Sequence, residues 1–231
     1  RSSPATRRRY CMGVKDRYWS RQIAQLRQRV YGSELPSVSQ IAHENADPFR
    51  VLLSTIISLR TKDEVTSRAS VRLFEIADTP ETILKVDEKT IADAIYPAGF
   101  YRTKAKQMQA CAKIILENHS GRVPSTREEL LLLPGVGIKT ANLTLNLGFG
   151  IDAICVDTHV HRIANRIGWI TTKTPEESER ALSEVLPQEY WIEINQLLVT
   201  YGKRVCTPVS PRCSTCPLHR ECSQNGVTRT R

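Results

Sequence analysis

Residues 128–150 read EELLLLPGVGIKTANLTLNLGFG, and this stretch decides the fold. A leucine-rich helix end meets Pro134, and a second helical pattern begins directly after two glycines, Gly135 and Gly137. Glycines two residues apart allow a tight reversal with positive φ. They also bring the N–H groups of Gly135, Val136 and Gly137 to the second helix's N-terminus, a site that binds phosphate without reading a base sequence. The stretch predicts a helical hairpin over about residues 126–148, and an ordinary turn between two helices is the alternative.

Lys139 lies in the first turn of the second helix of this hairpin. The positive end of the helix dipole favours an uncharged amine there, and a free amine can attack an electrophilic carbon to form a Schiff base. Beside a phosphate-binding hairpin, we expect that carbon to belong to a sugar. A lysine that only contacts phosphate is the alternative.

Asp157 follows eighteen residues later, within ICVDTHVHRIANRIGW (residues 154–169). It precedes a helical pattern, so we expect it to cap the N-terminus of a helix. The same carboxylate can face Lys139, stabilise cationic charge on the sugar and help proton transfer. The two roles are compatible.

Helical apolar spacing extends through most of the chain, including residues 101–116, and prolines divide it at intervals that suit helices of roughly 8–18 residues. The apolar run from Val51 to Leu59 is rich in Val, Ile and Thr and is compatible with a buried strand. A buried helix is the better prediction, because Asp47-Pro48 is typical of a helix start and a single strand would lack a partner. The sequence therefore predicts an all-α fold.

Four of the seven cysteines lie near the C-terminus with the spacing C-x6-C-x2-C-x5-C. They are Cys206, Cys213, Cys216 and Cys222. Four thiolates in one short loop indicate a site for a soft metal, either zinc or a [4Fe–4S] cluster. The wide outer spacing suits the cluster better, although spacing alone leaves zinc open. The other three cysteines are scattered singly, as buried or free thiols are.

The composition limits the class of protein. The 231 residues include 33 Lys+Arg against 24 Asp+Glu, a formal net charge of +9, with 40% hydrophobic and 25% charged residues, which excludes wholesale disorder. The longest apolar run is too short to span a bilayer, and the Arg-rich start lacks the apolar segment of a secretory signal. We therefore expect an intracellular protein without a membrane partner. The basic excess favours a polyanionic partner, with nucleic acid ahead of a membrane surface.

Three motifs in order, LPGVGIKTAN, VDTHVHRIANR and the four-cysteine tail, resemble the endonuclease III family of DNA glycosylases/AP lyases, which belongs to the helix-hairpin-helix superfamily. The likeness covers about residues 16–223, and YPAGFYRTKAKQ (96–107) is most similar to the branch with eukaryotic members. The resemblance implies a six-helix domain with the hairpin (residues 41–151) and an iron–sulfur domain built from residues 16–40 and 152–231. Residues 1–15 are expected to be a flexible basic leader.

The resemblance also implies an activity. Lys139 would attack C1′ of a damaged nucleotide and displace the base, Asp157 would assist, and β-elimination would nick the strand 3′ to the lesion. The substrates would be oxidised pyrimidines or abasic sites in double-stranded DNA. The four cysteines would hold a [4Fe–4S] cluster, and Arg212 would contact phosphate. The protein would act as a monomer, in the cytoplasm (nucleoid) of a prokaryote or in the nucleus or mitochondria of a eukaryote.

Phe100 and His159 occupy the positions of two residues that fill the gap left by an extruded nucleotide in that family. The third position usually carries glutamine and here carries Arg60, which puts the preference for the opposite base in doubt. Related classes fit less well. The adenine-glycosylase branch needs a catalytic acid that Val51–Leu59 lacks, and monofunctional mismatch glycosylases generally lack a lysine at position 139. A non-catalytic DNA-binding module would not need Lys139 paired with Asp157.

Overall fold

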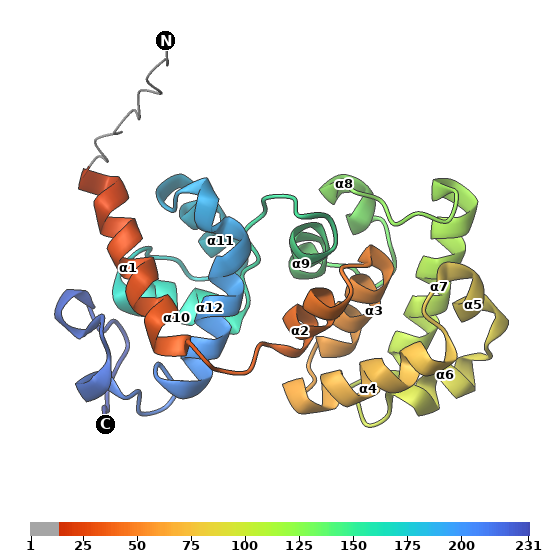
Figure 1. The fold of residues 1–231 in the computed structure, drawn as a ribbon, viewed down its shortest axis with the longest axis horizontal. Helices are drawn as coiled ribbons and strands as arrows, with labels where there is room; N and C mark the ends of the chain where they lie inside the picture. The colour runs from red at the N-terminus through yellow and green to blue at the C-terminus, as the bar shows by residue number, and fades with distance from the viewer. Residues whose placement is uncertain (1–13) are drawn as a thin grey trace, which may run out of the picture.

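The computed structural model describes residues 14–231, which form helices and connecting loops and contain no strand (Figure 1). The α-helices in chain order are α1 (Val14–Val30), α2 (Ser37–Glu44), α3 (Pro48–Ser58), α4 (Asp63–Ile76), α5 (Pro80–Lys85), α6 (Glu88–Ile95), α7 (Tyr101–His119), α8 (Arg127–Leu131), α9 (Ile138–Phe149), α10 (Thr158–Ile167), α11 (Pro175–Val185) and α12 (Trp191–Arg204). Three short 3₁₀ turns are η1 (Gln188–Tyr190), η2 (Cys213–Thr215) and η3 (His219–Glu221). The predicted all-α fold is confirmed. No helix in the described range is long and apolar enough to cross a membrane.

The predicted leader falls almost entirely outside the described residues. Only its last two positions are covered, and they belong to α1, because that helix begins at Val14.

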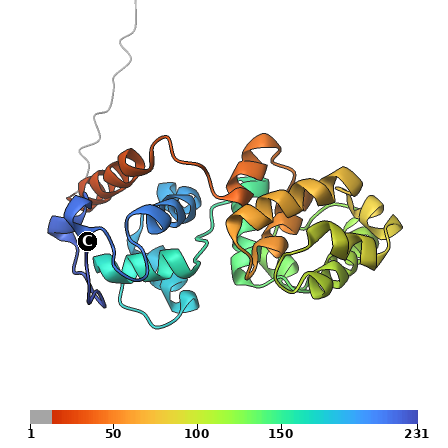
Figure 2. The same cartoon turned by 90° about the horizontal axis from the view of Figure 1, so that it is seen from below.

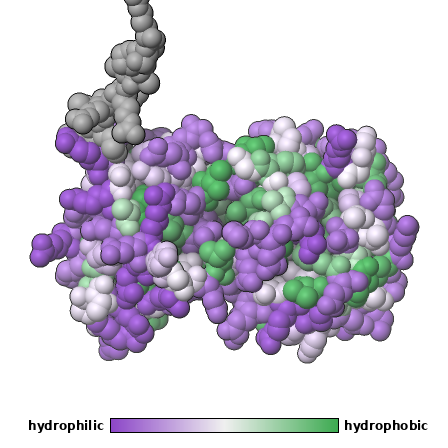
Figure 3. Space-filling view, in the orientation of Figure 1, coloured by the Kyte–Doolittle hydropathy of each residue, from purple (hydrophilic) through white to green (hydrophobic). Residues whose placement is uncertain are grey.

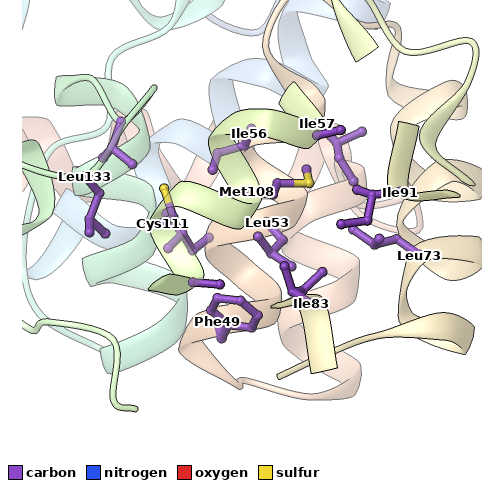
Figure 4. Close-up of a cluster of buried hydrophobic side chains, with 14 of the residues drawn as sticks. Phe49, Leu53, Ile56, Ile57, Leu73, Ile83, Ile91, Met108, Cys111 and Leu133 are labelled. Atoms are coloured by element: carbon purple, nitrogen blue, oxygen red, sulfur yellow. The ribbon is translucent and has the colours of Figure 1, made fainter. Parts of the chain in front are cut away.

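Helices α2 to α9 gather into one lobe, the α2–α9 lobe (residues 37–149), on the right in Figure 1. Six of its helices have eight or more residues, and α5 and α8 are shorter. The core side chains of α3 and α7, among them Leu53, Ile56 and Met108, meet those of the surrounding helices (Figure 4). This lobe therefore has a hydrophobic core of its own.

The apolar run at residues 51–59 forms most of α3, so the helix prediction is confirmed and the strand alternative is wrong. Asp47 caps the helix, and its Oδ1 accepts the N–H groups of Phe49 and Arg50, both at 2.9 Å. Pro48 occupies the first turn, where its missing N–H costs nothing. The helix lacks a polar face because α2, α4, α7 and α9 all pack against it.

The second lobe, the terminal lobe, combines α1 with α10 and its N-cap residue, α11, α12 and the C-terminal loop (residues 14–30 and 157–231), on the left in Figure 1. Helix α1 packs on α12, and its buried Trp19, Ile23 and Leu26 share a core with Ile163 and Leu198. The two ends of the described chain are therefore parts of one folded unit.

Two connections join the lobes, residues 31–36 and residues 150–156 (Figures 1 and 2). The face drawn in Figure 3 is mostly hydrophilic over the terminal lobe, and hydrophobic side chains gather toward the middle and over the α2–α9 lobe. The boundary between the lobes is where the residues of the predicted site meet.

Candidate active site

The predicted hairpin consists of α8, the turn at residues 132–137 and α9. Gly135 has a φ of +77°, a left-handed backbone conformation that side chains disfavour, so this position favours glycine. Gly137 has a φ of −100° and extended backbone, and it serves as the N-cap of α9. The tight reversal thus depends on positive φ at Gly135 alone.

Helix α9 begins with free backbone donors. Its first backbone bond is donated by Ala141 to the carbonyl of Gly137 at 2.9 Å, so the N–H groups of Ile138, Lys139 and Thr140 have no acceptor within the helix. A glycine at the N-cap has no side chain to take up these donors. This arrangement is suited to binding an anion.

Val136 corrects one expectation. Its N–H already donates to the carbonyl of Leu133 at 3.1 Å, because the tight turn closes on itself, and its side chain is buried in the core of the α2–α9 lobe. Neither group is open to a ligand. Val136 therefore stabilises the turn of the hairpin. The N–H groups without an acceptor in the helix are those of Ile138, Lys139 and Thr140.

Lys139 lies half-buried in the first turn of α9 and lines a cleft of about 740 Å³ between the two lobes. Behind it, the thiol of Cys155 contacts the Lys139 carbonyl at 3.7 Å. Complete burial raises the pKa of Cys155 to about 12, so this thiol is a neutral support. Cys155 and Cys111 are both buried without a disulfide, as expected, and Cys11 lies outside the described residues.

Asp157 lines the same cleft from the other lobe, at the start of α10. Its Oδ1 accepts the N–H groups of His159 at 2.8 Å and Val160 at 2.9 Å, so the predicted N-cap is confirmed. Only one carboxylate oxygen takes part in the cap. The cleft therefore brings together Lys139 and Asp157, although the lobes that carry them have separate cores.

Arg60 and Phe100 lie together at the rim of the α2–α9 lobe. Both are exposed, and both have left-handed backbone, with φ of +52° and +57°. The Arg60 guanidinium carbon lies 5.5 Å from the centre of the Phe100 ring, within the range of a cation–π contact. Arg60 also lines the cleft.

His159 lines the cleft from α10 and is half-buried. Its Nδ1 lies 3.2 Å from Nη2 of Arg162, and a side chain on Gly202 would collide with the imidazole. Burial lowers the pKa of His159, opposed by the neighbouring Asp157 carboxylate and reinforced by nearby cations, including Arg162. The imidazole therefore favours the neutral form in this site.

An ion pair that the sequence did not reveal crosses the cleft. Lys203 of α12 donates to Asp63 Oδ2 at 2.8 Å, while Asp63 Oδ1 accepts from the N–H and the hydroxyl of Ser37 at 3.1 and 2.8 Å. Although burial opposes it, these hydrogen bonds hold the pKa of Asp63 below its usual value. Asp63 thus connects α12 of one lobe to the beginnings of α2 and α4 of the other.

The four cysteines of the C-terminal loop line one small cavity together with apolar side chains such as Ile167 and Leu218 and with polar ones such as Arg166. No three Cys, His, Asp or Glu side chains among residues 14–231 are grouped to hold a metal ion. Burial, followed by the neighbouring thiols, raises the pKa of Cys213. Four thiolates there would need added positive charge, which a [4Fe–4S] cluster would supply.

Arg166 holds this loop from α10. It is buried, and its guanidinium donates to the carbonyls of Thr207 at 2.7 Å and Pro208 at 2.6 Å, and to Cys206 Sγ at 3.6 Å. Arg162, on the same helix, donates to the carbonyl of Cys206 at 2.9 Å, so two side chains of α10 hold the loop.

Arg212 does not line the cleft. It lines a separate hollow of about 480 Å³ with four other basic residues and one hydroxyl. The hollow is lined by Arg29, Lys203, Arg204, Thr207, Arg212 and Arg231. Lys203 lines both spaces, so the hollow adjoins the cleft.

Residues 53–188 match the family model of the HhH-GPD superfamily of base excision DNA repair proteins. The chain is 49% identical to endonuclease III of Thermotoga maritima over 180 residues, which are 78% of this chain and 84% of that protein. It is 42% identical to endonuclease III-like protein 1 of Bos taurus over 210 residues, 86% of this chain and 68% of that protein. The chain belongs to the endonuclease III family. It is a base excision repair DNA glycosylase with AP lyase activity.

Solved structures share the fold of this chain. A trapped covalent intermediate of endonuclease III with DNA superposes with a TM-score of 0.79 at 29% identity, covering 92% of this chain and 97% of that one. A thermostable thymine-DNA glycosylase superposes with a TM-score of 0.78 at 24% identity, over 92% and 98% of the two chains, and shares the fold alone. The fold is therefore common to related glycosylases, and the chemistry has to be argued from the residues in the cleft.

Proposed function

We propose that this protein removes oxidised pyrimidines from double-stranded DNA through a Schiff base on Lys139 and then nicks the strand 3′ to the abasic site. The observation that carries the proposal is that Lys139 and Asp157 line one cleft from opposite lobes. The residue limits inferred for the two domains, 16–40 with 152–231 and 41–151, belong to the same proposal, since they place one reacting group in each domain.

The reaction begins with attack of the free amine of Lys139 on C1′ of the nucleotide. A C1′–N bond to the lysine forms, the bond to the base breaks, and the base leaves with that electron pair and gains a proton. The sugar ring then opens to give the iminium. Loss of a proton from C2′ expels the 3′ phosphate by cleavage of the C3′–O bond, which is the β-elimination, and water later releases the amine.

Asp157 supplies negative charge beside the cationic sugar and the iminium. Its Oδ1 is held by the two N–H groups of the cap, and its second oxygen accepts no hydrogen bond within the described residues, so it remains available for a proton or a hydroxyl of the sugar. Cap and catalyst therefore use different oxygens of one carboxylate.

Binding of duplex DNA in this proposal uses phosphate contacts at two places. The free N–H groups at the start of α9, next to Gly135 and Gly137, bind one phosphate without reading sequence. Arg212 and the basic hollow around it bind another. Arg60, Phe100 and His159 fill the gap when the damaged nucleotide turns into the cleft. The protein acts as a monomer.

In this proposal Cys206, Cys213, Cys216 and Cys222, which line one cavity, would hold a [4Fe–4S] cluster. When bound, the cluster provides the positive charge that four thiolates need and keeps the loop closed. Arg166 anchors the same loop to α10 and so keeps Arg212 next to the cleft.

Borohydride trapping tests the proposal, because reduction of the Schiff base links enzyme and DNA covalently. Wild-type protein is expected to be trapped on duplex DNA with thymine glycol or an abasic site, and Lys139→Gln is expected to give no covalent product. Lys62→Gln is the matched control, since Lys62 also lines the cleft, and it should still be trapped. Equal trapping of wild type and Lys139→Gln would overturn the assignment.

A further inference from the structure

Lys104 is a buried lysine for which the reaction has no use. It lies in the first turn of α7 with only 3% of its surface exposed. Its ammonium donates to the carbonyls of Ile57 at 2.7 Å and Leu59 at 2.6 Å, and to the hydroxyl of Thr61 at 3.0 Å. No carboxylate in the described part of the chain pairs with it, so three neutral oxygens take all three of its protons.

Burying an unpaired ammonium is costly, since an ion loses several kcal/mol of hydration on entering a protein interior. Burial lowers the pKa of Lys104 to about 8, and the three hydrogen bonds that its ammonium donates favour the charged form, which predominates at neutral pH. Water or a glycine cap satisfies the carbonyls at a helix end at lower cost. The use of a buried lysine instead therefore points to a need for a fixed geometry in the segment that carries these three acceptors.

The segment that Lys104 holds carries Arg60. Its three acceptors lie on both sides of that residue, whose left-handed backbone is unfavourable for a residue with a side chain. A fixed partner is needed to keep such a conformation populated, and Lys104 provides it.

The same segment is joined to the turn that carries Phe100. The hydroxyl of Thr61 accepts the N–H of Gly99 at 3.0 Å, in addition to the ammonium of Lys104. A Cβ on Gly99 would lie 2.4 Å from the Arg60 carbonyl oxygen, so the two turns touch. The cation–π contact between Arg60 and Phe100 completes the connection.

We propose that Lys104 is a positioning residue that holds Arg60 and Phe100 as one preformed wedge for insertion into the gap in the duplex. The inference rests on the proposed base-extruding function. Extrusion of a nucleotide costs a few kcal/mol, and a wedge that is already ordered enters the gap without a further loss of side-chain and loop entropy. Arg60 then stacks on Phe100 inside the DNA and presents its guanidinium to the base opposite the gap.

The variant Lys104→Met tests this inference, because methionine fills a similar volume and donates no hydrogen bond. Lys113→Met is the matched control, a solvent-exposed lysine on the same helix. The wedge matters for duplex DNA and not for a single-stranded abasic oligonucleotide, which has no partner strand to part. We expect Lys104→Met to remove thymine glycol from duplex DNA at least tenfold more slowly in single turnover, with trapping on the single-stranded abasic oligonucleotide within twofold of wild type.

A spectroscopic measurement separates positioning from catalysis. With 2-aminopurine opposite a stable abasic-site analogue, insertion of the wedge changes the fluorescence of that base. Lys104→Met is expected to give at most half of the wild-type change at saturating protein, and Lys113→Met the full change.

Gly99→Ala disturbs the wedge without altering the buried lysine, because its methyl group displaces the Arg60 carbonyl. If Lys104→Met does not fold, Gly99→Ala replaces it in these experiments. We then expect slower removal of thymine glycol from duplex DNA, with trapping on the single-stranded abasic oligonucleotide unchanged. Wild-type protein that traps no DNA would contradict the proposed function. If wild type is trapped but the variants are as fast as wild type on duplex DNA, the wedge proposal is wrong and the proposed function stands. The same holds if the variants are slowed equally on duplex DNA and on the single-stranded oligonucleotide.

Discussion

Asp157 has two assigned roles, helix cap and catalytic carboxylate, and two substitutions separate them. Asp157→Asn keeps an oxygen that can accept the N–H groups of His159 and Val160, and removes the charge. Asp157→Ala removes both. The two variants should therefore lose the same activity and differ in stability.

The magnitudes follow from the hydrogen bonds of the cap. Loss of an N-cap side chain costs about 1 kcal/mol, which in a chain of this size lowers Tm by about 2–4 °C. Asparagine is as good a cap as aspartate, so Asp157→Asn loses only the attraction between the carboxylate and the dipole of α10, at most about 0.5 kcal/mol at this partly exposed position. Both variants lose the carboxylate beside the sugar, which costs about 10²–10⁴-fold in rate.

Urea unfolding measures the first effect, and single-turnover removal of thymine glycol from duplex DNA measures the second. Asp157→Asn destabilised as much as Asp157→Ala would show that the cap described here does not support α10. A full wild-type rate for Asp157→Asn would show that the negative charge at the cleft is not needed.

Two further predictions concern buried cations. The pKa of Lys104 is about 8 in the folded protein and 10.5 in the unfolded chain. Between these two pH values the unfolded chain binds more protons, so the free energy of unfolding of wild type relative to Lys104→Met should rise with pH by about 3 kcal/mol in urea titrations. A difference that does not change with pH would contradict the buried charge. Metal analysis of wild type should find about four iron and four sulfide per chain. Arg166→Met removes the hydrogen bonds to the carbonyls of Thr207 and Pro208, and it should retain less than half of the iron and sulfide. Arg180→Met, at an exposed position, is the control. One zinc per chain in the wild type, or full iron in Arg166→Met, would refute this reasoning.

Local signals in the sequence were sufficient for the elements and for the caps. Asp47-Pro48 marked the start of α3, and Asp157 marked that of α10, because a cap depends on two or three neighbouring residues. Glycine spacing located the hairpin. It did not reveal that the N–H of Val136 is used inside the turn, since that depends on the closure of the turn onto Leu133.

Contacts between distant elements were not predictable in the same way. Asp63 and Lys203 are 140 residues apart, and no pattern in either helix indicates that the two meet across the cleft. Lys104 did leave a signal, because it lies four residues before Met108 and seven before Cys111, on the buried face of α7. A lysine at such a position is expected to reach the surface with its long side chain, and only the carbonyls at the end of α3 show why this one does not.

The packing of α1 on α12 determines the order in which the two lobes can fold during synthesis. The α2–α9 lobe can close once its last helix has left the ribosome, but the apolar side chains of α1, including Trp19 and Leu26, have no core until α12 appears with Leu198. At 5–20 residues per second, the delay between synthesis of α1 and synthesis of α12 is roughly 10–30 s. During this interval the apolar side chains of α1 are not yet buried, which makes α1 a segment on which a nascent-chain chaperone can act.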